Sequence, residues 1–349
     1  MIITKIQKEL KNKELDGMLI SSAENRRYVC GFTGSAGLLL ITCDDAVLFV
    51  DGRYTTQARL ETKNLRVEEY KSAPYKLLNE YCLHRLAIED KSLPFAEYKK
   101  LKEEMSTAEL ACGSEIMERL RIVKTADEIE CIRKAAEISD SAFSYILDFV
   151  EPGLTEQEIA LELELFMRHN GAEGVAFDTI AASGEYSALP HARTTNRVVK
   201  HGDMLLLDFG CKYNGYCSDM TRTVAVGGAS AENIKVYNAV LAAQTAAIEV
   251  VKSGVVCAAV DKTARDVITS LGYAGAFNHS LGHGVGMEVH ELPLLSPKSD
   301  KKLAAGNCIT VEPGIYLPGK FGVRIEDLVV VTEDGCVNLT NSTKEFLVI

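Results

Sequence analysis

Two segments that lie far apart in the chain share one pattern, and this pattern constrains the fold more than any other feature of the sequence. Each is an apolar strand that ends in an acid, followed by a turn and a return strand that carries a second acid. Such a pattern predicts two β-hairpins, each with a pair of carboxylates, and suggests an internal duplication. The segments are residues 203–224, with Asp208 and Asp219, and residues 308–330, with Glu312 and Glu326.

The register of the first hairpin follows from its turn. Asn214-Gly215 is the strongest short signal for a hairpin. A two-residue turn there places Asp208 opposite Thr221, and it places Asp219 opposite Gly210. The two aspartates then become diagonal neighbours on one face of the hairpin, where both side chains can reach one ion.

The charges on this hairpin need an explanation. Two carboxylates on otherwise apolar strands are costly to bury unless a cation neutralises them. Arg222 is the one apparent cation beside them in the sequence, and a metal ion is another way to supply the charge. The alternative is that both acids face solvent at an exposed sheet edge. The hairpin alone leaves both interpretations open.

A histidine-rich segment lies between the two hairpins. Residues 278–291 contain His279, His283 and His290, out of 7 histidines in the chain. Glycines on both sides of His283 indicate a loop or a strand end with little side-chain bulk to block an ion. A single histidine is more often structural than a ligand, but three between two acid-bearing hairpins favour a metal site.

The composition of this site indicates its chemistry. One imidazole and four carboxylates form an oxygen-rich set, which suits two divalent ions such as Mn²⁺, Co²⁺ or Fe²⁺ better than metals that select thiols, with Zn²⁺ as a further alternative. Two such ions about 3.5–4 Å apart lower the pKa of a water molecule that they share. We therefore expect hydrolysis.

The organisation of the chain indicates two domains. Residues 1–120 combine short apolar strands with helical segments, which is typical of an α/β unit. The rest combines four helices with strands, and Thr125 and Thr155 are the predicted N-caps of the first two helices. The predicted strands are 17–20, 37–41 and 46–50, with a turn at Asp44-Asp45, and the predicted helices are 54–60, 95–105, 126–149, 155–169, 232–253 and 260–271. The helical pattern changes between residues 120 and 125, where we place the boundary.

Composition excludes several classes of function. A length of 349 residues fits two domains, and a net charge of -11 disfavours nucleic-acid or membrane-surface binding. The apolar runs are too short to span a bilayer and the N-terminus lacks a signal-peptide pattern. The 10 cysteines contain no Cys-x-x-Cys pair, so we expect reduced thiols in a cytoplasmic protein.

On these motifs the sequence resembles the Xaa-Pro aminopeptidase and Xaa-Pro dipeptidase (prolidase) branch of the pita-bread metallopeptidases. Residues 31–35 and 50–54 resemble the creatinase-type N-terminal domain, so the resemblance covers essentially the whole chain. It implies an α/β creatinase-like domain over residues 1–121 and an α+β pita-bread (creatinase/aminopeptidase) catalytic domain over residues 122–349. It also implies a homodimer that binds two divalent ions per subunit, with Mn²⁺ as the expected metal. The implied substrate is a peptide or dipeptide with proline second, cleaved at the bond before that proline.

The resemblance also assigns roles to the metal-site residues. It implies that Asp208 chelates one ion with both oxygens and that Asp219 and Glu326 bridge the two ions. His283 and Glu312 would hold the second ion, with Glu312 also moving a proton. No ligand position departs from the family pattern, whereas creatine amidinohydrolase has the same fold without the metal site.

Further residues match the substrate side of the family. His191 resembles a histidine that closes over the substrate, and His279 one that lines the proline pocket. His290 resembles one that hydrogen-bonds the scissile carbonyl and stabilises the oxyanion. Tyr316 and Arg324 resemble groups beside the metal or the substrate, and a structural role is the alternative for all five.

Three other functions stay open. A metallopeptidase of other specificity, such as a methionine aminopeptidase-like enzyme, is disfavoured by the additional N-terminal domain. A catalytically silent binding homologue is disfavoured by the intact ligand set. A creatinase-like amidinohydrolase predicts no metal. The motifs do not separate an aminopeptidase from a dipeptidase.

Overall fold

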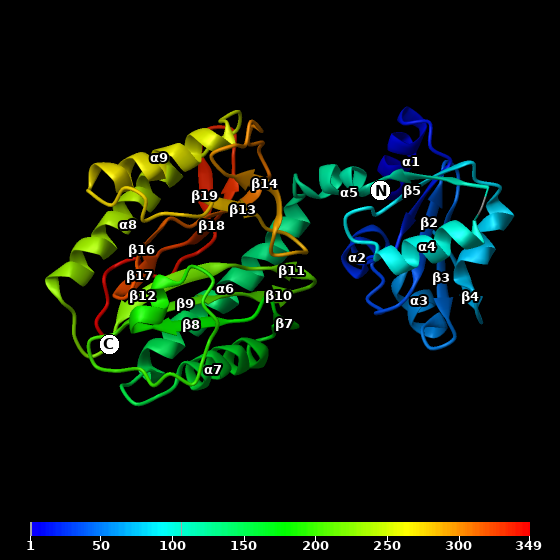
Figure 1. Ribbon diagram of the computed structural model, residues 1–349. Helices are drawn as coiled ribbons and strands as arrows, with labels where there is room; N and C mark the ends of the chain where they lie inside the picture. The colour runs from blue at the N-terminus through cyan, green and yellow to red at the C-terminus, as the bar shows by residue number, and fades with distance from the viewer. Residues whose placement is uncertain (1, 106) are drawn as a thin grey trace. The chain divides into compact units, whose positions relative to one another are not determined.

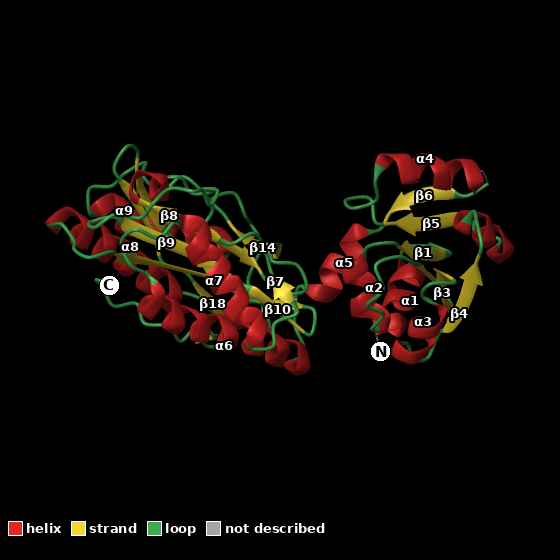
Figure 2. Cartoon of the chain, turned by 90° about the horizontal axis from the view of Figure 1, so that it is seen from below, coloured by secondary structure: helices red, strands yellow, loops and turns green. Residues whose placement is uncertain are grey.

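The computed structural model describes residues 2–105 and 107–349. The chain divides into two compact units, Met1–Arg121 and Ile122–Ile349 (Figure 1). In both units helices flank strands (Figure 2). Each unit is described by itself below.

The smaller unit is built around a six-stranded sheet. The strand order is β4-β3-β2-β1-β5-β6, with β1 antiparallel to β2 and parallel to β5. The strands are β1 Gly17–Ile20, β2 Leu38–Thr42, β3 Ala46–Asp51, β4 Arg66–Tyr70, β5 Arg85–Ile88 and β6 Glu109–Cys112. The helices are α1 Ile2–Asn12, α2 Ala23–Cys30, α3 Thr55–Glu61, α4 Phe95–Glu104 and α5 Ser114–Arg121, with a 3₁₀ segment η1 Pro74–Tyr81.

Alternation along the strands gives this unit two hydrophobic layers. Met18 and Ile20 pack on the side of α1, whereas Leu19 packs on the side of α4 and η1. Because successive side chains of a strand point to opposite faces, a continuous apolar strand fits a sheet that is covered on both sides.

The larger unit contains four long helices in two pairs. The helices are α6 Ala126–Phe149, α7 Glu156–His169, α8 Ala231–Glu249 and α9 Cys257–Ser270. Helices α6 and α7 begin at the predicted N-caps, and both Thr125 and Thr155 form complete capping boxes. The core of α6 and α7 includes Leu205 of the first hairpin, and that of α8 and α9 includes Ile309 of the second.

The strands of this unit form short sheets around the two hairpins. The sheets are β12-β9-β8, β11-β10-β7, β14-β13-β15-β18-β19 and β16-β17. The strands are β7 Gly174–Val175, β8 Ile180–Ser183, β9 Met204–Phe209, β10 Cys211–Tyr213, β11 Tyr216–Cys217, β12 Met220–Ala225, β13 Gly282–Gly284, β14 Glu291–Leu295, β15 Cys308–Val311, β16 Gly314–Leu317, β17 Phe321–Arg324, β18 Asp327–Val331 and β19 Cys336–Asn338, with the 3₁₀ segment η2 Gly184–Ala188.

The first hairpin has the predicted register. Asp208 pairs with Thr221 between β9 and β12, and Tyr213 pairs with Tyr216 around the turn. Both turn residues have positive φ, 48° at Asn214 and 82° at Gly215, as a type I′ turn requires. The hairpin prediction is therefore confirmed at the level of individual residue pairs.

The second hairpin places its two glutamates opposite each other. Val311 pairs with Asp327 between β15 and β18, and Gly314 pairs with Arg324 between β16 and β17. These two pairings continue one register, so Glu312 faces Glu326 in the gap between them.

Two predicted helix boundaries were wrong. Helix α8 ends at Glu249 rather than at residue 253, because the chain then turns and the Ser253 N–H binds the Thr332 carbonyl. Helix α9 begins at Cys257 rather than at residue 260 without a side-chain cap. An isolated bridge between Val256 and Lys302 sets its start. The two residues are distant in sequence, so no local signal predicts this bridge.

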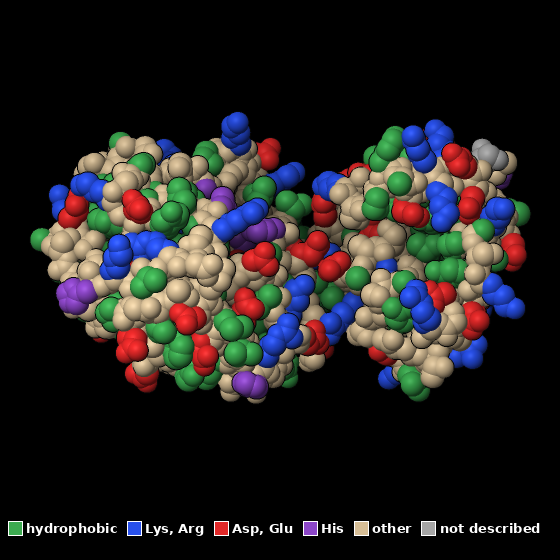
Figure 3. Space-filling view, turned by 60° about the horizontal axis from the view of Figure 1, so that its bottom comes forward, with side chains coloured by type: hydrophobic (Ala, Val, Ile, Leu, Met, Phe, Trp, Pro, Cys, Tyr) green, Lys and Arg blue, Asp and Glu red, His purple; other side chains and the backbone are tan. Residues whose placement is uncertain are grey.

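The surface is mixed in charge. On the face drawn in Figure 3, acidic and basic side chains are interspersed over both units. Within the part of the chain that the structure describes, no helix has both the length and the apolar character that a membrane crossing needs.

Candidate metal centre

A cleft of about 310 Å³ in the larger unit collects the residues singled out in the sequence. Nine of the ten predicted site residues line it, although they come from segments far apart in the chain. Tyr316, the tenth, lies behind the cleft wall, where its hydroxyl contacts His279 and Arg324. The nine are His191, Asp208, Asp219, His279, His283, His290, Glu312, Arg324 and Glu326.

The four acids come from matching places on the two hairpins. Asp208 lies near the end of β9 and Asp219 directly precedes β12. Glu312 directly follows β15, and Glu326 lies between β17 and β18. Asp208 is held by regular pairing with Thr221, whereas the other three acids lie just outside the strands, where the regular pairing next to them fixes their positions.

His283 approaches the acids from β13, between two glycines. A Cβ at Gly282 would collide with the Thr310 carbonyl, and one at Gly284 with the Leu292 carbonyl. Glycine is therefore required at both positions for β13 to lie close to its neighbouring strands. The prediction that these glycines let the imidazole approach a crowded site agrees with this packing.

The tautomer of His283 leaves its Nε2 unprotonated, and this nitrogen faces the acids. Its Nδ1 lies 3.1 Å from the Gly284 carbonyl, and because a carbonyl only accepts, Nδ1 carries the proton. Burial lowers the pKa of His283 to about 4, so the ring is neutral and Nε2 has a lone pair. That nitrogen lies 3.3 Å from Glu312 Oε1 and 3.6 Å from Asp219 Oδ2. Three electron-rich atoms facing one another in this way call for a cation between them.

The acids show the same need for positive charge. Burial, followed by repulsion from Glu326, Asp208 and Glu312, raises the pKa of Asp219 well above its usual value. Burial and the other acids also raise the pKa of Glu326, and burial raises that of Glu312 to about 8. Without a cation these carboxyls therefore favour their protonated forms.

A metal fits the donor atoms at the centre of the cluster. Ligand atoms of Asp219, His283 and Glu326 all lie within 4.8 Å of one another. Among the residues described, Asp208 Oδ1 and Glu326 Oε1 are buried without a hydrogen-bond partner. Unpaired buried carboxylate oxygens are costly, and a divalent ion that prefers oxygen ligands would satisfy them.

Arg324 is committed to contacts within the protein. The guanidinium is buried and forms an ion pair with Asp208 Oδ2. Nε donates to Thr221 Oγ1 over 3.1 Å, and an Nη atom donates to the Pro190 carbonyl over 3.1 Å and to the Tyr316 hydroxyl over 2.8 Å. These contacts place Arg324 beside the acids as a support.

His279 and His290 differ in how much of each ring is available. His279 Nδ1 donates to the Ser280 carbonyl and Nε2 accepts from the Tyr316 hydroxyl, each over 2.8 Å. Burial lowers the pKa of His279 to about 3, so this side chain presents a neutral ring surface to the cleft. In the described residues no group forms a hydrogen bond with the His290 ring, which packs edge-on against His283 at 4.3 Å. Partial burial lowers the pKa of His290 as well.

A buried ion pair anchors the loop that carries His290. Glu291 follows it in sequence, and Glu291 Oε2 accepts from Lys124 Nζ over 3.2 Å, both side chains being buried. Glu291 Oε1 accepts from the Glu288 N–H over 3.1 Å. A Cβ at Gly286 would collide with this carboxylate. His191 lines the cleft from the loop that follows η2.

Sequence reasoning missed two threonines that support the acids. Thr221 Oγ1 donates to Glu326 Oε2 over 2.6 Å. Thr310 Oγ1 accepts from the His283 N–H over 3.0 Å and donates to Glu312 Oε1 over 3.2 Å. Each lies two residues from an acid, and side chains spaced by two along a strand share a face, so this spacing was the signal. The apolar lining was also missed, and it comprises Phe177, Ile180, Val289 and Leu294.

Comparison with known proteins identifies the family. Residues 130–333 match metallopeptidase family M24, and residues 2–123 match the creatinase/prolidase N-terminal domain. The chain belongs to metallopeptidase family M24. The predicted fold class, a creatinase-type N-terminal domain followed by a pita-bread domain, is thereby confirmed, and membership implies divalent metal ions.

Similar proteins match over nearly their full length. The Xaa-Pro dipeptidase of Pyrococcus horikoshii is 38% identical over 348 residues, which cover 99% of this chain and 98% of that protein. The structure of an Xaa-Pro dipeptidase from Bacillus anthracis has a TM-score of 0.96 at 40% identity, covering 100% of this chain and 99% of the other. The structure of an X-Pro aminopeptidase from Thermotoga maritima has a TM-score of 0.90 at 40% identity, covering 96% and 98%.

Proposed function

We propose that this protein hydrolyses the bond between an N-terminal residue and a following proline, and that residues 122–349 form its catalytic domain. The observation that carries the proposal is the cluster of Asp219, His283 and Glu326, whose ligand atoms lie within 4.8 Å of one another in an open cleft. The names of similar proteins, Xaa-Pro dipeptidase and X-Pro aminopeptidase, support the substrate class.

Five residues hold two divalent ions in this proposal. Asp208 would hold one ion, His283 and Glu312 would hold the other, and Asp219 and Glu326 would be shared between the two. The unpaired oxygens of Asp208 and Glu326 and the bare Nε2 of His283 support this set. When bound, the two ions supply the positive charge that lowers the pKa of an attacking water molecule and polarises the scissile carbonyl.

The other groups of the cleft bind the substrate and move protons. Glu312 receives the proton of the attacking water and delivers it to the proline nitrogen, so that the C–N bond breaks and a secondary amine leaves. His290, whose ring forms no hydrogen bond within the described residues, donates to the carbonyl oxygen as negative charge develops there. His191 closes over the substrate from the loop that follows η2.

The cleft walls suit a proline ring. The nitrogen of an Xaa-Pro bond carries no hydrogen and the ring fixes φ, so a binding site needs no acceptor at that position. His279 offers a ring whose nitrogens are already used by Ser280 and Tyr316. Phe177, Ile180 and Leu294 add apolar surface, as small-molecule sites typically do.

Three further properties belong to the proposal. We expect Mn²⁺ as the metal, because oxygen-rich sites favour it over thiol-selecting ions. All 10 cysteines are free thiols, which supports a reducing, cytoplasmic location. We also expect a homodimer, and light scattering at micromolar concentration tests it, with a monomer as the contradicting result.

Turnover measured together with metal content tests the function. The metal-free protein should be inactive, and Mn²⁺ should restore cleavage of Xaa-Pro dipeptides but not of matched Xaa-Ala dipeptides. Full activity in metal-free protein, or equal turnover of both substrates, contradicts the proposal. Xaa-Pro-Yaa tripeptides in the same assay separate the two candidate activities, since an aminopeptidase cleaves them and a dipeptidase does not.

A further inference from the structure

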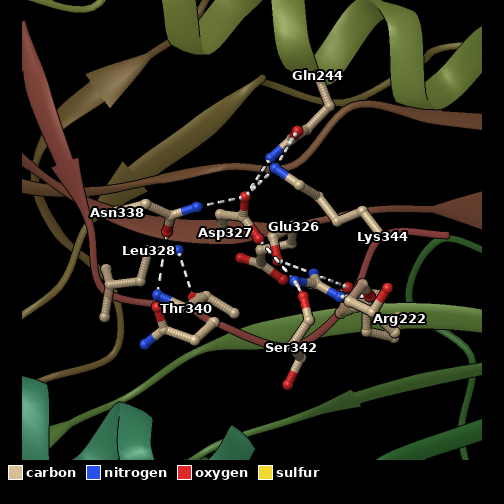
Figure 4. A network of polar contacts seen from close by, with 12 residues as sticks. Arg222, Gln244, Glu326, Asp327, Leu328, Asn338, Thr340, Ser342 and Lys344 are labelled. Atoms are coloured by element: carbon tan, nitrogen blue, oxygen red, sulfur yellow. Dashed lines mark hydrogen bonds and ion pairs between the residues drawn. The ribbon is translucent and has the colours of Figure 1, made fainter.

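The two hairpins are joined by a buried ion pair on the side away from the cleft. Arg222 of β12 and Asp327 of β18 are almost fully buried, at 1% and 0% side-chain exposure, and an Nη atom of Arg222 lies 2.8 Å from Asp327 Oδ1 (Figure 4). One residue before each of them, Thr221 and Glu326 form a hydrogen bond. Successive strand residues point to opposite faces, so the ion pair lies directly behind that contact.

Arg222 also binds the main chain of both hairpins. Its other Nη atom donates to the Glu326 carbonyl over 2.5 Å and to the Thr221 carbonyl over 2.9 Å. Nε donates to the Thr343 carbonyl over 3.0 Å, and the first Nη atom donates to the Ser342 carbonyl over 2.8 Å. One planar guanidinium therefore fixes the strand that follows Asp219 relative to the strand that follows Glu326.

Asp327 has other hydrogen-bond partners besides Arg222. Its second oxygen accepts from Gln244 over 2.9 Å, from Asn338 over 2.8 Å and from Lys344 over 2.6 Å (Figure 4). Because Lys344 already supplies a positive charge, a second cation is not needed for neutrality, and the distinctive contribution of Arg222 is its fixed set of hydrogen bonds.

We propose that Arg222 and Asp327 are positioning residues that set the separation of Asp219 and Glu326, and thereby the affinity for metal. This inference rests on the proposed metal ligands. A buried ion pair is weak evidence for a role in stability, because an apolar pair of similar volume often replaces it without loss. The rigid donor fork of arginine, which lysine lacks, is suited to holding two strands at a fixed distance.

Three variants separate positioning from charge and from packing. Arg222→Lys keeps the charge but loses the fork, and the double variant Arg222→Met with Asp327→Leu replaces the pair by apolar side chains. Lys344→Met is the matched control, because it removes a charge from the same Asp327 but contacts neither Thr221 nor Glu326. Mn²⁺ affinity is measured by titration into the metal-free proteins, together with the Tm of each metal-free protein.

We expect Arg222→Lys and the double variant to bind Mn²⁺ about tenfold or more weakly, the usual effect of removing a group that orients ligands. The metal-free double variant should have a lower Tm, because the carbonyls that bind Arg222 and the amides that bind Asp327 lose their partners, but it should stay folded at the temperature of the titration. Lys344→Met should keep the natural affinity. Natural affinity in Arg222→Lys, or an equal loss in Lys344→Met, overturns the inference. If the unmodified protein itself does not bind Mn²⁺, the proposed ligand set is wrong. This outcome is distinguishable because it does not depend on any of the variants.

Discussion

The two acid-bearing hairpins of the larger unit share a pattern but place their acids differently. In the first, a two-residue turn at Asn214 and Gly215 makes Asp208 and Asp219 diagonal neighbours. In the second, a longer turn follows β16, and Glu312 lies opposite Glu326. Glutamates are one methylene longer than aspartates, so the second hairpin reaches the same centre from a different backbone position.

The hairpins also differ in what accompanies their acids. On the cleft side, Arg324 of the second hairpin pairs with Asp208 of the first, whereas Glu326 receives only the hydroxyl of Thr221 and keeps one oxygen unpaired among the described residues. On the side away from the cleft, the arginine comes from the first hairpin and the acid from the second, because Arg222 pairs with Asp327. Each hairpin therefore contributes one arginine that pairs with an acid of the other hairpin, so neither half of the site is complete alone.

Removal of one acid from each hairpin should have the largest effect. Asp219→Ala and Glu326→Ala should each lose more metal than His283→Ala, because in the proposed ligand set each of these acids would contact both ions and the imidazole would contact one. Atomic absorption on the purified proteins measures their metal content, and circular dichroism is the control for folding. Equal loss of a single ion in all three variants would contradict the bridging roles.

A histidine that belongs to neither hairpin should affect turnover without affecting metal. His290→Ala should keep its metal and its fold but turn over Xaa-Pro substrates at least about tenfold more slowly, since loss of one oxyanion donor typically costs about 10²–10³ in rate. The effect should fall on kcat more than on KM, because the donor acts most strongly in the transition state. Loss of an ion would make His290 a ligand, and an unchanged kcat would favour a structural role.

Removal of the hydroxyls of Thr221 and Thr310 should have a smaller effect on metal affinity. Thr221→Val and Thr310→Val remove hydroxyls that bind Glu326 and Glu312, one from each hairpin. Each should lower Mn²⁺ affinity about tenfold, the low end for groups that orient ligands. Both variants should also cost about 1–3 kcal/mol of unfolding free energy, because each leaves a buried donor, Arg324 Nε or the His283 N–H, without its acceptor. Titration and urea unfolding separate the two effects, and an unchanged affinity in both variants would show that the hydroxyls do not orient the acids.

Much of this site was predictable because its signals are local. The Asn214-Gly215 turn fixed the register of the first hairpin, and period-two alternation then placed Asp208 and Asp219 on one face. The capping boxes at Thr125 and Thr155 likewise gave correct starts for α6 and α7.

The contacts between the hairpins were not predictable from such signals. Arg324 meets Asp208, and Arg222 meets Asp327, across more than 100 positions of sequence. No turn or periodicity specifies which acid a distant arginine reaches, since that depends on how two separately formed hairpins pack. The same reason explains why strands β4, β5 and β6 of the smaller unit were missed, because their pairing rather than their composition defines them.

Substitutions in the turns of the two hairpins should have the smallest effect, and this effect should fall on the free energy of unfolding. Gly215 and Gly319 have φ values of 82° and 74°, a conformation that costs an L-residue about 1–2 kcal/mol. Gly215→Ala and Gly319→Ala should therefore each lose about 1 kcal/mol of unfolding free energy, toward the low end of that range. Gly335→Ala is the control, because that glycine is absent from the positive-φ positions and a Cβ there meets nothing within 4 Å.

Neither turn variant should lose metal, because pairing beyond the turns holds the acids. Strands β9 and β12 pair from Met204 to Phe209, and β15 and β18 pair from Cys308 to Val311. Urea unfolding and metal content on the same samples test both parts. If Gly215→Ala lost metal and Gly319→Ala did not, the tight turn itself would control the spacing of Asp208 and Asp219. The two hairpins would then differ in how their acids are held as well as in where they lie.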